Sequence, residues 1–264
     1  MDRVTQYLTT GYIARDIRYY KEVASTNTEA KNAADAINGT LFIADTQTAG
    51  RGRLGRGWAS PEGTGIWMSL LLTPDIAPER IPQLTLVAGM AVCRAIGAGA
   101  MIKWPNDIVI GTKTKRCRDR SEISYKAKKV CGILTEYSGG KVICGIGINV
   151  NTREFPPELK HIATSIYLET GRATDRDMLA AVVMNGFEPL YDRFLNGGFA
   201  VLADQYRELC VTIGREVTVT GAGETVSGTA SGITADGGLV IDTAGGQRII
   251  TSGEASVRGI YGYI

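Results

Sequence analysis

The sequence has little of what several common enzyme classes require. Its single histidine, His161, sits in a polar segment, and no GxSxG elbow is present, which argues against a Ser-His-Asp hydrolase. No GxxxxGK[ST] motif occurs, so any ATP must be held by something other than a P-loop. No apolar run reaches the roughly 18 residues of a membrane span, and the N-terminus lacks the apolar region of a signal peptide. We therefore expect no membrane partner.

Cysteine is also scarce. The five cysteines are scattered and odd in number, and none forms a CxxC pair, so a zinc ribbon or a thioredoxin-type site is disfavoured. Most lie in apolar stretches, where a free thiol behaves as a small buried hydrophobe. We expect a reducing cytoplasm and no disulfides. The cysteines are Cys93, Cys117, Cys131, Cys144 and Cys210.

Glycine, in contrast, is abundant. The chain has 33 glycines in 264 residues, about twice the usual share of roughly 7%. This density indicates many tight turns and places where the backbone approaches a ligand. The formal net charge of +2 is too small to argue by itself for nucleic acid or a membrane surface.

Hydrophobic periodicity predicts a larger part with strands and helices, followed by a smaller all-β part. Thr26 and Glu29 fit a capping box at the start of an alanine-rich helix, and Gly139-Gly140 sits in a predicted β-hairpin. A polar, basic stretch over 112–128 breaks the strand pattern, and its core, 113–126, is expected to be a solvated excursion.

After 208–212 short strands alternate with glycine-rich turns, as in a small barrel of about 50 residues. The predicted domains are 1–208 and 209–264. Strands are expected at 18–24, 41–46, 65–73, 101–104, 108–110, 130–137 and 142–150, and helices at 26–39, 78–97, 175–195 and 198–210.

The most conspicuous motif is the segment GRGRLGRGW, which contains Arg51, Arg53 and Arg56 and ends at Trp58. It spells GxGxxG, but no helix can open in register on its last glycine, as a dinucleotide fingerprint requires. Arginines interleaved with glycines indicate a mobile cationic loop that closes over a phosphate or carboxylate. The alternative is a solvated flexible loop.

A second motif, KWPND, places Lys103, Asn106 and Asp107 at the end of a buried strand. Ligands collect at strand ends in α/β sheets. The lysine suits a phosphate, and the aspartate suits Mg²⁺. The alternative is a turn whose polar residues are Asn and Asp.

Two further segments, KKVCGIL and GIGINVN, carry Lys129 and Asn149. Lys129 opens an apolar strand, so it either points into a pocket or is a solvated charge at a strand end. Glycines inside the second strand weaken it unless a ligand or another backbone must approach closely. Asn149 could read an adenine edge, and the alternative for this strand is a β-bulge.

Taken together and in this order, Ser25-Thr26-Asn27, Gln47 with GRGRLGRGW, KWPND, KKVCGIL and GIGINVN resemble the biotin protein ligase family. Their joint order and spacing are specific, and the resemblance covers essentially the whole chain. It implies an α+β fold: a mixed-sheet catalytic domain related to class II aminoacyl-tRNA synthetases, followed by an SH3-like C-terminal β-barrel. It also implies ATP-dependent activation of biotin to biotinyl-5′-AMP and transfer of biotin to a lysine of a carboxylase's carrier domain.

The resemblance also implies roles for individual residues. Lys129, Arg53 and Lys103 would be catalytic, and Asp107 would hold Mg²⁺. Trp58 or Trp67 would supply an apolar wall. Biotin would be bound by Ser25, Thr26, Asn27, Gln47, Arg51, Gly52, Arg53, Lys129 and Gly132. ATP and the adenylate would be bound by Arg53, Arg56, Trp58, Lys103, Asn106, Asp107 and Asn149.

Two departures from the family pattern are visible. Only about 17 residues precede the first strand, too few for the helix-turn-helix domain of the family's repressors, so no nucleic-acid partner is expected. The hairpin before Lys129 carries the basic insertion 113–126, which affects the expected local geometry around Lys129. A homodimer is left open. The rival functions are a lipoate or octanoate ligase, a non-catalytic biotin- or nucleotide-binding regulator, and a nucleic-acid-binding module.

Overall fold

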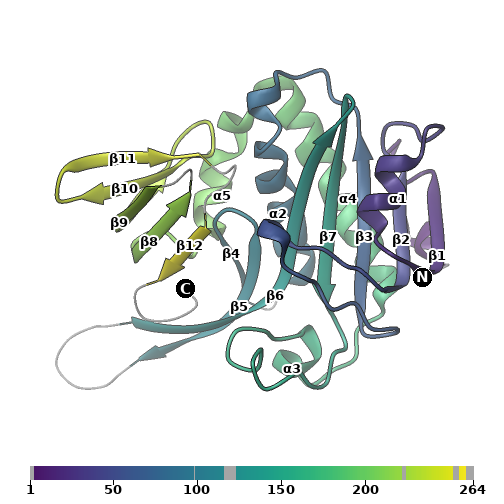
Figure 1. The fold of residues 1–264 in the computed structure, drawn as a ribbon, viewed down its shortest axis with the longest axis horizontal. Helices are drawn as coiled ribbons and strands as arrows, with labels where there is room; N and C mark the ends of the chain where they lie inside the picture. Colours follow the sequence, from purple (N-terminus) through teal and green to yellow (C-terminus); the bar gives the residue numbers. More distant parts are fainter. Residues whose placement is uncertain (1–2, 98, 116–122, 222–223, 252–255, 260–264) are drawn as a thin grey trace.

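A mixed seven-stranded sheet in the order β1-β2-β3-β7-β6-β5-β4 forms the larger part of the chain (Figure 1). The computed structural model describes residues 3–97, 99–115, 123–221, 224–251 and 256–259. Only β1 and β2 pair in parallel, and every other neighbouring pair is antiparallel. The strands are β1 (Ile17–Val23), β2 (Leu41–Gln47), β3 (Gly65–Leu72), β4 (Ala100–Lys103), β5 (Asp107–Lys115), β6 (Ile123–Ser138) and β7 (Lys141–Asn149).

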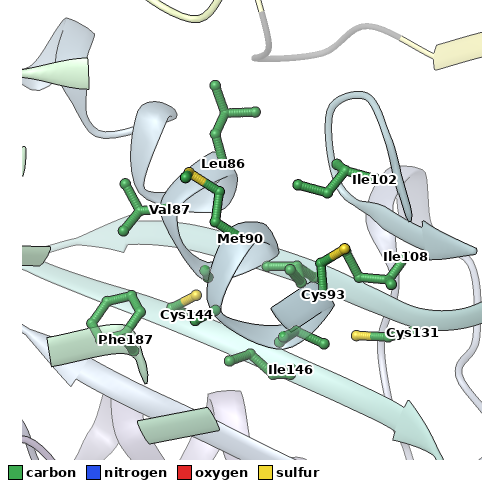
Figure 2. Close-up of a cluster of buried hydrophobic side chains, with 14 of the residues drawn as sticks. Leu86, Val87, Met90, Cys93, Ile102, Ile108, Cys131, Cys144, Ile146 and Phe187 are labelled. Carbon is green, nitrogen blue, oxygen red and sulfur yellow. The ribbon is translucent and has the colours of Figure 1, made fainter. Parts of the chain in front are cut away.

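Successive strand residues point to opposite sides of a sheet. In β3 every residue is buried, so both faces are covered, and helices lie on each of them. On one face lie α2 (Gln83–Ile96) and α4 (Arg176–Gly197), whose apolar side chains join the main core. Figure 2 shows α2 lying over the strands, in a buried cluster that includes Met90, Cys93, Cys131, Cys144 and Ile146. On the other face, α1 (Thr26–Asn32) packs a small cluster made of Ala30, Phe42, Leu71 and Ile143.

The smaller part is a five-stranded antiparallel sheet in the order β11-β10-β9-β8-β12. It follows α5 (Ala203–Leu209) and consists of β8 (Glu216–Gly221), β9 (Glu224–Ile233), β10 (Leu239–Thr243), β11 (Gly246–Ile250) and β12 (Ser256–Gly259). Trp104 joins the two parts: its backbone N–H donates to Thr212 Oγ1 at 3.0 Å, and its indole N–H donates to Gly237 O at 3.0 Å. These two contacts hold the KWPND segment against the smaller part.

The remaining elements are short. The segment that links β7 to α4 contains α3 (Ile166–Thr170). Four 3-10 turns complete the described structure: Val4–Tyr7, Arg53–Gly55, Pro78–Arg80 and Phe199–Leu202. In the part of the chain that the structure describes, no helix is both long enough and apolar enough to cross a membrane.

The predicted strands are confirmed in order and position, and the turn at Gly139-Gly140 has positive φ at both residues, as a tight hairpin requires. Three predictions are wrong in detail. The first helix ends at Asn32 and not near Gly39, and α2 begins only after Pro82. The stretch 112–128 does not break the sheet, because β5 continues to Lys115 and β6 begins at Ile123, with backbone pairing between them. Residues 116–122 of the insertion lie outside the described residues.

The predicted capping box is also wrong. Ser25, and not Thr26, is the N-cap of α1, and its side chain makes no capping hydrogen bond. The hydroxyl and the backbone N–H of Thr26 instead contact Gln47 Oε1, at 3.1 and 2.9 Å. The helix start is therefore bound to the end of β2, which leaves its side chains on the wall of a cavity.

Candidate active site

Two adjoining cavities lie where the ends of β2, β5, β6 and β7 meet the start of α1. The smaller, which we call the inner cavity, measures about 50 Å³, and the larger, the outer cavity, measures about 610 Å³. The outer cavity has the volume expected of a site for a small organic ligand, roughly 300–1,000 Å³. Both cavities are lined by Gly52, Arg53, Trp58, Asn106 and Lys129. Two ligands would therefore meet at an arginine and a lysine.

The structure brings the residues predicted from the sequence together in two sets. The inner cavity is lined by all nine residues predicted for biotin: Ser25, Thr26, Asn27, Gln47, Arg51, Gly52, Arg53, Lys129 and Gly132. The outer cavity is lined by all seven predicted for ATP: Arg53, Arg56, Trp58, Lys103, Asn106, Asp107 and Asn149. Trp67, the alternative apolar wall, lines neither cavity. It is buried in β3, and its indole N–H donates to Pro61 O at 3.4 Å.

The glycine- and arginine-rich segment forms a short hairpin over the inner cavity. Gly52 N donates to Arg56 O at 2.7 Å, and Trp58 N donates to Gly50 O at 2.9 Å. At its tip, Leu54 and Gly55 both have positive φ. Leu54 is 62% exposed, so the tip of the hairpin buries little apolar surface. A short hairpin with an exposed tip opens at low free-energy cost.

A β-bulge in β6 directs Lys129 toward the cavities. Ile108 pairs with Cys131, whereas Val109 pairs with Lys129, so Val130 is an extra residue in β6. Val130 and Cys131 are both fully buried in the core, while Lys129 and Gly132 line the inner cavity. Without the extra residue, strict alternation would turn Lys129 into the core. The bulge therefore determines which way this lysine points.

The backbone around Lys129 is fixed by a segment that follows β7. Lys129 N donates to Ile162 O at 2.7 Å, and Thr164 N donates to Lys129 O at 2.8 Å. Thr164 O in turn accepts from Asn149 Nδ2 at 3.1 Å, and Asn149 is buried. Asn149 therefore holds the end of β7 against the segment that supports Lys129.

The charged side chains at the junction of the two cavities form a linked set. Lys129 Nζ lies 2.5 Å from Asp107 Oδ1, and it lies 5.1 Å from the centre of the Trp58 ring. Arg53 Nη1 donates to Asn106 Oδ1 at 2.9 Å, and Asn106 Nδ2 donates to Ile133 O at 3.1 Å. Two cations, Arg53 and Lys129, therefore lie where the two cavities meet.

Lys103, which lines the outer cavity, is the most deeply buried cation around the two cavities, with an exposed fraction of 3%. Burial lowers its pKa from its usual value to about 8, although the negative charge of Asp107 opposes the shift. A buried lysine that lines a cavity and carries a perturbed pKa is typical of a functional site. An anion in the outer cavity would stabilise its charged form.

Glycines form the floor of the inner cavity. A Cβ on Gly147 would lie 2.6 Å from Trp58 Nε1, and one on Gly132 would lie 3.0 Å from the Trp58 ring and 3.1 Å from Lys129 Nζ. The indole therefore rests directly on the backbone of β6 and β7. Trp58 Nε1 is buried and has no hydrogen-bond partner within the described residues. Such a group normally finds a partner, so this atom fits a ligand that supplies an acceptor.

Sequence reasoning missed two polar residues beside the inner cavity. Ser69, on β3, is fully buried and contacts Thr26 and Asn27. Glu136, on β6, accepts from Asn27 Nδ2. A serine inside the apolar run GIWMSLLL was the available signal, because a buried hydroxyl requires a partner. Glu136 gave no signal, since a glutamate near a strand end is ordinary.

Family models match the chain in two places. The Biotin/lipoate A/B protein ligase family model matches residues 19–152, and the Biotin protein ligase C terminal domain model matches residues 212–258. The first covers about half of the chain and contains every residue predicted to form the site. The second covers the five-stranded sheet.

Individual relatives agree with these matches. The chain is 38% identical to the Bifunctional ligase/repressor BirA of Bacillus subtilis, over 94% of this chain and 75% of that protein. It is 32% identical to the Biotin--[acetyl-CoA-carboxylase] ligase of Mycobacterium tuberculosis, over 91% and 88%.

Among solved structures, the biotin protein ligase from Aquifex aeolicus in complex with biotin and ATP superposes with a TM-score of 0.81 at 35% identity. The match covers 93% of this chain and 99% of that chain. The fold, the paired cavities and these relatives agree. The chain belongs to the biotin protein ligase family.

Proposed function

We propose that the inner cavity binds biotin, that the outer cavity binds ATP, and that the residues shared by both cavities catalyse their union. The reaction is the ATP-dependent activation of biotin to biotinyl-5′-AMP, followed by transfer of biotin to a lysine of a biotin carrier domain of a carboxylase. The observation that carries the assignment of the site is the shared lining by Gly52, Arg53, Trp58, Asn106 and Lys129. A biotin carboxylate in the inner cavity would meet the α-phosphate of ATP in the outer cavity at Lys129 and Arg53.

In the first half-reaction, a carboxylate oxygen of biotin attacks the α-phosphorus of ATP and pyrophosphate leaves. Two anions are brought together, so preorganised cations around the pentavalent phosphorus are the main catalytic requirement. Lys129 would contact both the carboxylate and the α-phosphate, and Arg53 would contact the adenylate as the loop orders over it. Lys103, buried in the outer cavity, would contact the leaving phosphates. Oriented binding supplies much of the remaining rate.

In the second half-reaction, the amine of the carrier lysine attacks the acyl carbon and AMP leaves. The mixed anhydride also reacts with water, so a segment that closes over it protects it. The hairpin that contains Gly52 and Arg53 lines both cavities, and Leu54 at its tip is exposed. We assign this protective role to it.

Mg²⁺ would be held by Asp107 and by phosphate oxygens of ATP, where it would neutralise developing charge. Mg²⁺ is commonly bound by one or two carboxylates together with substrate phosphates, and Asp107 lies in the outer cavity beside Lys103 and Lys129. In the part of the chain that the structure describes, no group of three or more His, Cys, Asp or Glu side chains forms a metal site. The donor set therefore fits a metal that arrives with its nucleotide.

Further points of organisation belong to the proposal. We infer a catalytic domain over 1–208, related to class II aminoacyl-tRNA synthetases, and an SH3-like barrel over 209–264. The continuous five-stranded sheet β8–β12 supports the barrel. The four described cysteines are free and buried, which is compatible with the predicted reducing cytoplasm. A cytoplasmic location itself stays a prediction.

The test of the proposed function is incubation with ATP, Mg²⁺ and biotin, followed by mass spectrometry for biotinyl-5′-AMP and measurement of pyrophosphate release. A parallel reaction contains biotin and lipoate in equimolar amounts, since a lipoate or octanoate ligase is the nearest rival. We expect biotinyl-5′-AMP, and we expect that equimolar lipoate does not suppress it. Formation of lipoyl-AMP in preference, or binding without pyrophosphate release, would overturn the proposal.

A further inference from the structure

A hydrogen-bonded chain runs behind the polar wall of the inner cavity and ends on a carboxylate. Asn27 Nδ2 donates to Glu136 Oε2 at 2.7 Å. An ionised carboxylate can only accept hydrogen bonds, so the nitrogen of the Asn27 amide must face Glu136. The Asn27 oxygen must then face away from Glu136, toward Ser69. Glu136, with a longer contact from Asn27 Nδ2 to Leu134 O at 3.5 Å, thereby fixes an orientation that the near-symmetric amide would not choose by shape alone.

The next link is the hydroxyl of Ser69, which is fully buried on β3. Its Oγ lies 2.6 Å from Asn27 Oδ1 and 2.7 Å from Thr26 Oγ1. A hydroxyl has one hydrogen to donate, and Asn27 Oδ1 has none, so the Ser69 hydrogen goes to Asn27. The single hydrogen of the Thr26 hydroxyl then points either to Ser69 Oγ or to Gln47 Oε1, which lies 3.1 Å from Thr26 Oγ1. In both cases a lone pair of Thr26 Oγ1 is left available to accept.

The orientation of Gln47 follows from the same helix start. Thr26 N donates to Gln47 Oε1 at 2.9 Å, and Gln47 Nε2 donates to Ser60 Oγ at 2.8 Å. One N–H of Gln47 remains as a donor. The wall therefore presents acceptors at Thr26 and a donor at Gln47, and both residues line the inner cavity. A cyclic urea, with two N–H groups and one carbonyl, matches this pattern.

Close packing prevents Asn27 from escaping this arrangement. A Cβ on Gly145 would lie 2.2 Å from Asn27 Oδ1, so the amide rests directly on the backbone of β7. Glu136 itself lines neither cavity. Any influence it has on a ligand must pass through Asn27.

We propose that Glu136 is a positioning residue for biotin specificity: through Asn27 and Ser69, it sets the direction of the hydrogen bonds that the inner cavity offers to the ureido ring. This inference rests on the proposed function of the inner cavity. A site built to hydrogen-bond a ligand discriminates strongly against analogues that lack the matching groups. Glu136 therefore contributes to the rejection of lipoate, whose ring has no N–H group.

The test compares Glu136→Leu with Glu136→Gln in steady-state measurements of pyrophosphate release. The leucine cannot accept a hydrogen bond, whereas the glutamine oxygen can. Loss of one oriented hydrogen bond corresponds to a roughly tenfold effect. We expect the leucine variant to raise the KM for biotin about tenfold with the KM for ATP unchanged, and the glutamine variant to stay near wild type. Glu22→Leu, at an exposed glutamate on β1 outside both cavities, is the matched control.

A double-mutant cycle tests whether Glu136 acts through Asn27. In an Asn27→Ala background, Glu136→Leu should raise the KM for biotin no further. Ser69→Ala interrupts the chain one link later and should raise the same KM, which provides a second measurement if Glu136→Leu does not fold.

Three outcomes would overturn the inference. They are an unchanged KM for biotin in Glu136→Leu or in Ser69→Ala, an equal rise in the KM values of biotin and ATP, and a full additional effect in the Asn27→Ala background. Failure of the proposed function is distinguishable, because the wild-type protein would then form no biotinyl-5′-AMP at all.

Discussion

Lys129 Nζ lies 2.5 Å from Asp107 Oδ1, across two neighbouring strands and directly beside a bulge. The carboxylate holds the ammonium at the point where the inner and outer cavities meet. It also balances the charge of Lys129 when no anionic substrate is present. Binding of a carboxylate and a phosphate would let the lysine exchange one anionic partner for two others, at little cost in reorganisation.

Lys129→Ala should reduce the rate of adenylate formation by about 10²-fold, the effect typical of losing one preorganised contact to a developing charge. Pyrophosphate release in single-turnover experiments measures this rate. Lys128→Ala is the control, because Lys128 is the preceding residue in β6, is exposed and lines neither cavity. Near wild-type release by the Lys129 variant, with biotin and ATP bound, would remove Lys129 from the mechanism.

Lys103→Arg tests the consequence of burying a cation. The pKa of Lys103 is lowered to about 8, chiefly by burial and against the opposing charge of Asp107. Because a lowered lysine pKa means that the cation is lost earlier as pH rises, kcat/KM for ATP should fall through an inflection near pH 8 in the wild-type enzyme. An arginine stays charged throughout this range, so its profile should be flat between pH 7 and 9.5. A wild-type inflection that persists in the arginine variant would have to come from another group.

The positions of the site residues along the chain could be predicted from the sequence, but their geometry could not. Strand and helix periodicity placed the elements, and the motifs supplied Lys103, Asp107 and Lys129 at strand ends. Which way Lys129 points depends on the extra residue Val130. A run of apolar residues such as Val130-Cys131 reads equally well with or without a bulge, because periodicity alone does not determine register.

The hydrogen bonds that link Ser69, Asn27 and Glu136 behind the cavity wall were missed for a related reason. Ser69 meets Asn27 only because β3 pairs with β7 in a register that places Ser69 opposite Gly145, against which Asn27 packs. Cross-strand neighbours follow from the pairing of segments far apart in sequence. The capping-box pattern at Thr26 and Glu29 failed because a long-range partner, Gln47, contacts the Thr26 hydroxyl. Tertiary contacts replaced the local ones.

Gly147→Ala should impair biotin binding through Trp58. A Cβ at this position would lie 2.6 Å from Trp58 Nε1, so the indole must move off the strand. We expect the KM for biotin to rise about tenfold, as for loss of one good contact, with a near-native unfolding transition because the indole is only half-buried. Gly232→Ala is the control, since a Cβ there meets no atom within 4 Å. An unchanged KM would show that Trp58 is not part of the biotin wall.

Glu188→Gln should destabilise the protein in a pH-dependent way, because Glu188 binds the N-terminal segment to α4. Its carboxylate accepts from the backbone N–H groups of Gly11, Tyr12 and Ile13 at 2.6, 2.9 and 2.8 Å. Burial alone would raise the pKa of Glu188, but these three hydrogen bonds outweigh it and the pKa is lowered. A glutamine offers one accepting oxygen and no charge, so it cannot satisfy all three donors.

The sign of the pH dependence follows from the lowered pKa. The stabilisation by Glu188 is fully present above the unfolded pKa of about 4.3 and is lost as pH falls through the lower folded value. Urea unfolding of Glu188→Gln at pH 7.5 should therefore show a loss of about 2 kcal/mol, the scale of hydrogen bonds to a charged group. The deficit should narrow at pH 3.5, where the wild type is itself losing the interaction. Glu208→Gln, at an exposed glutamate on α5, should show neither effect. A deficit that stays constant between the two pH values would mean that the glutamine acts by shape and not by charge.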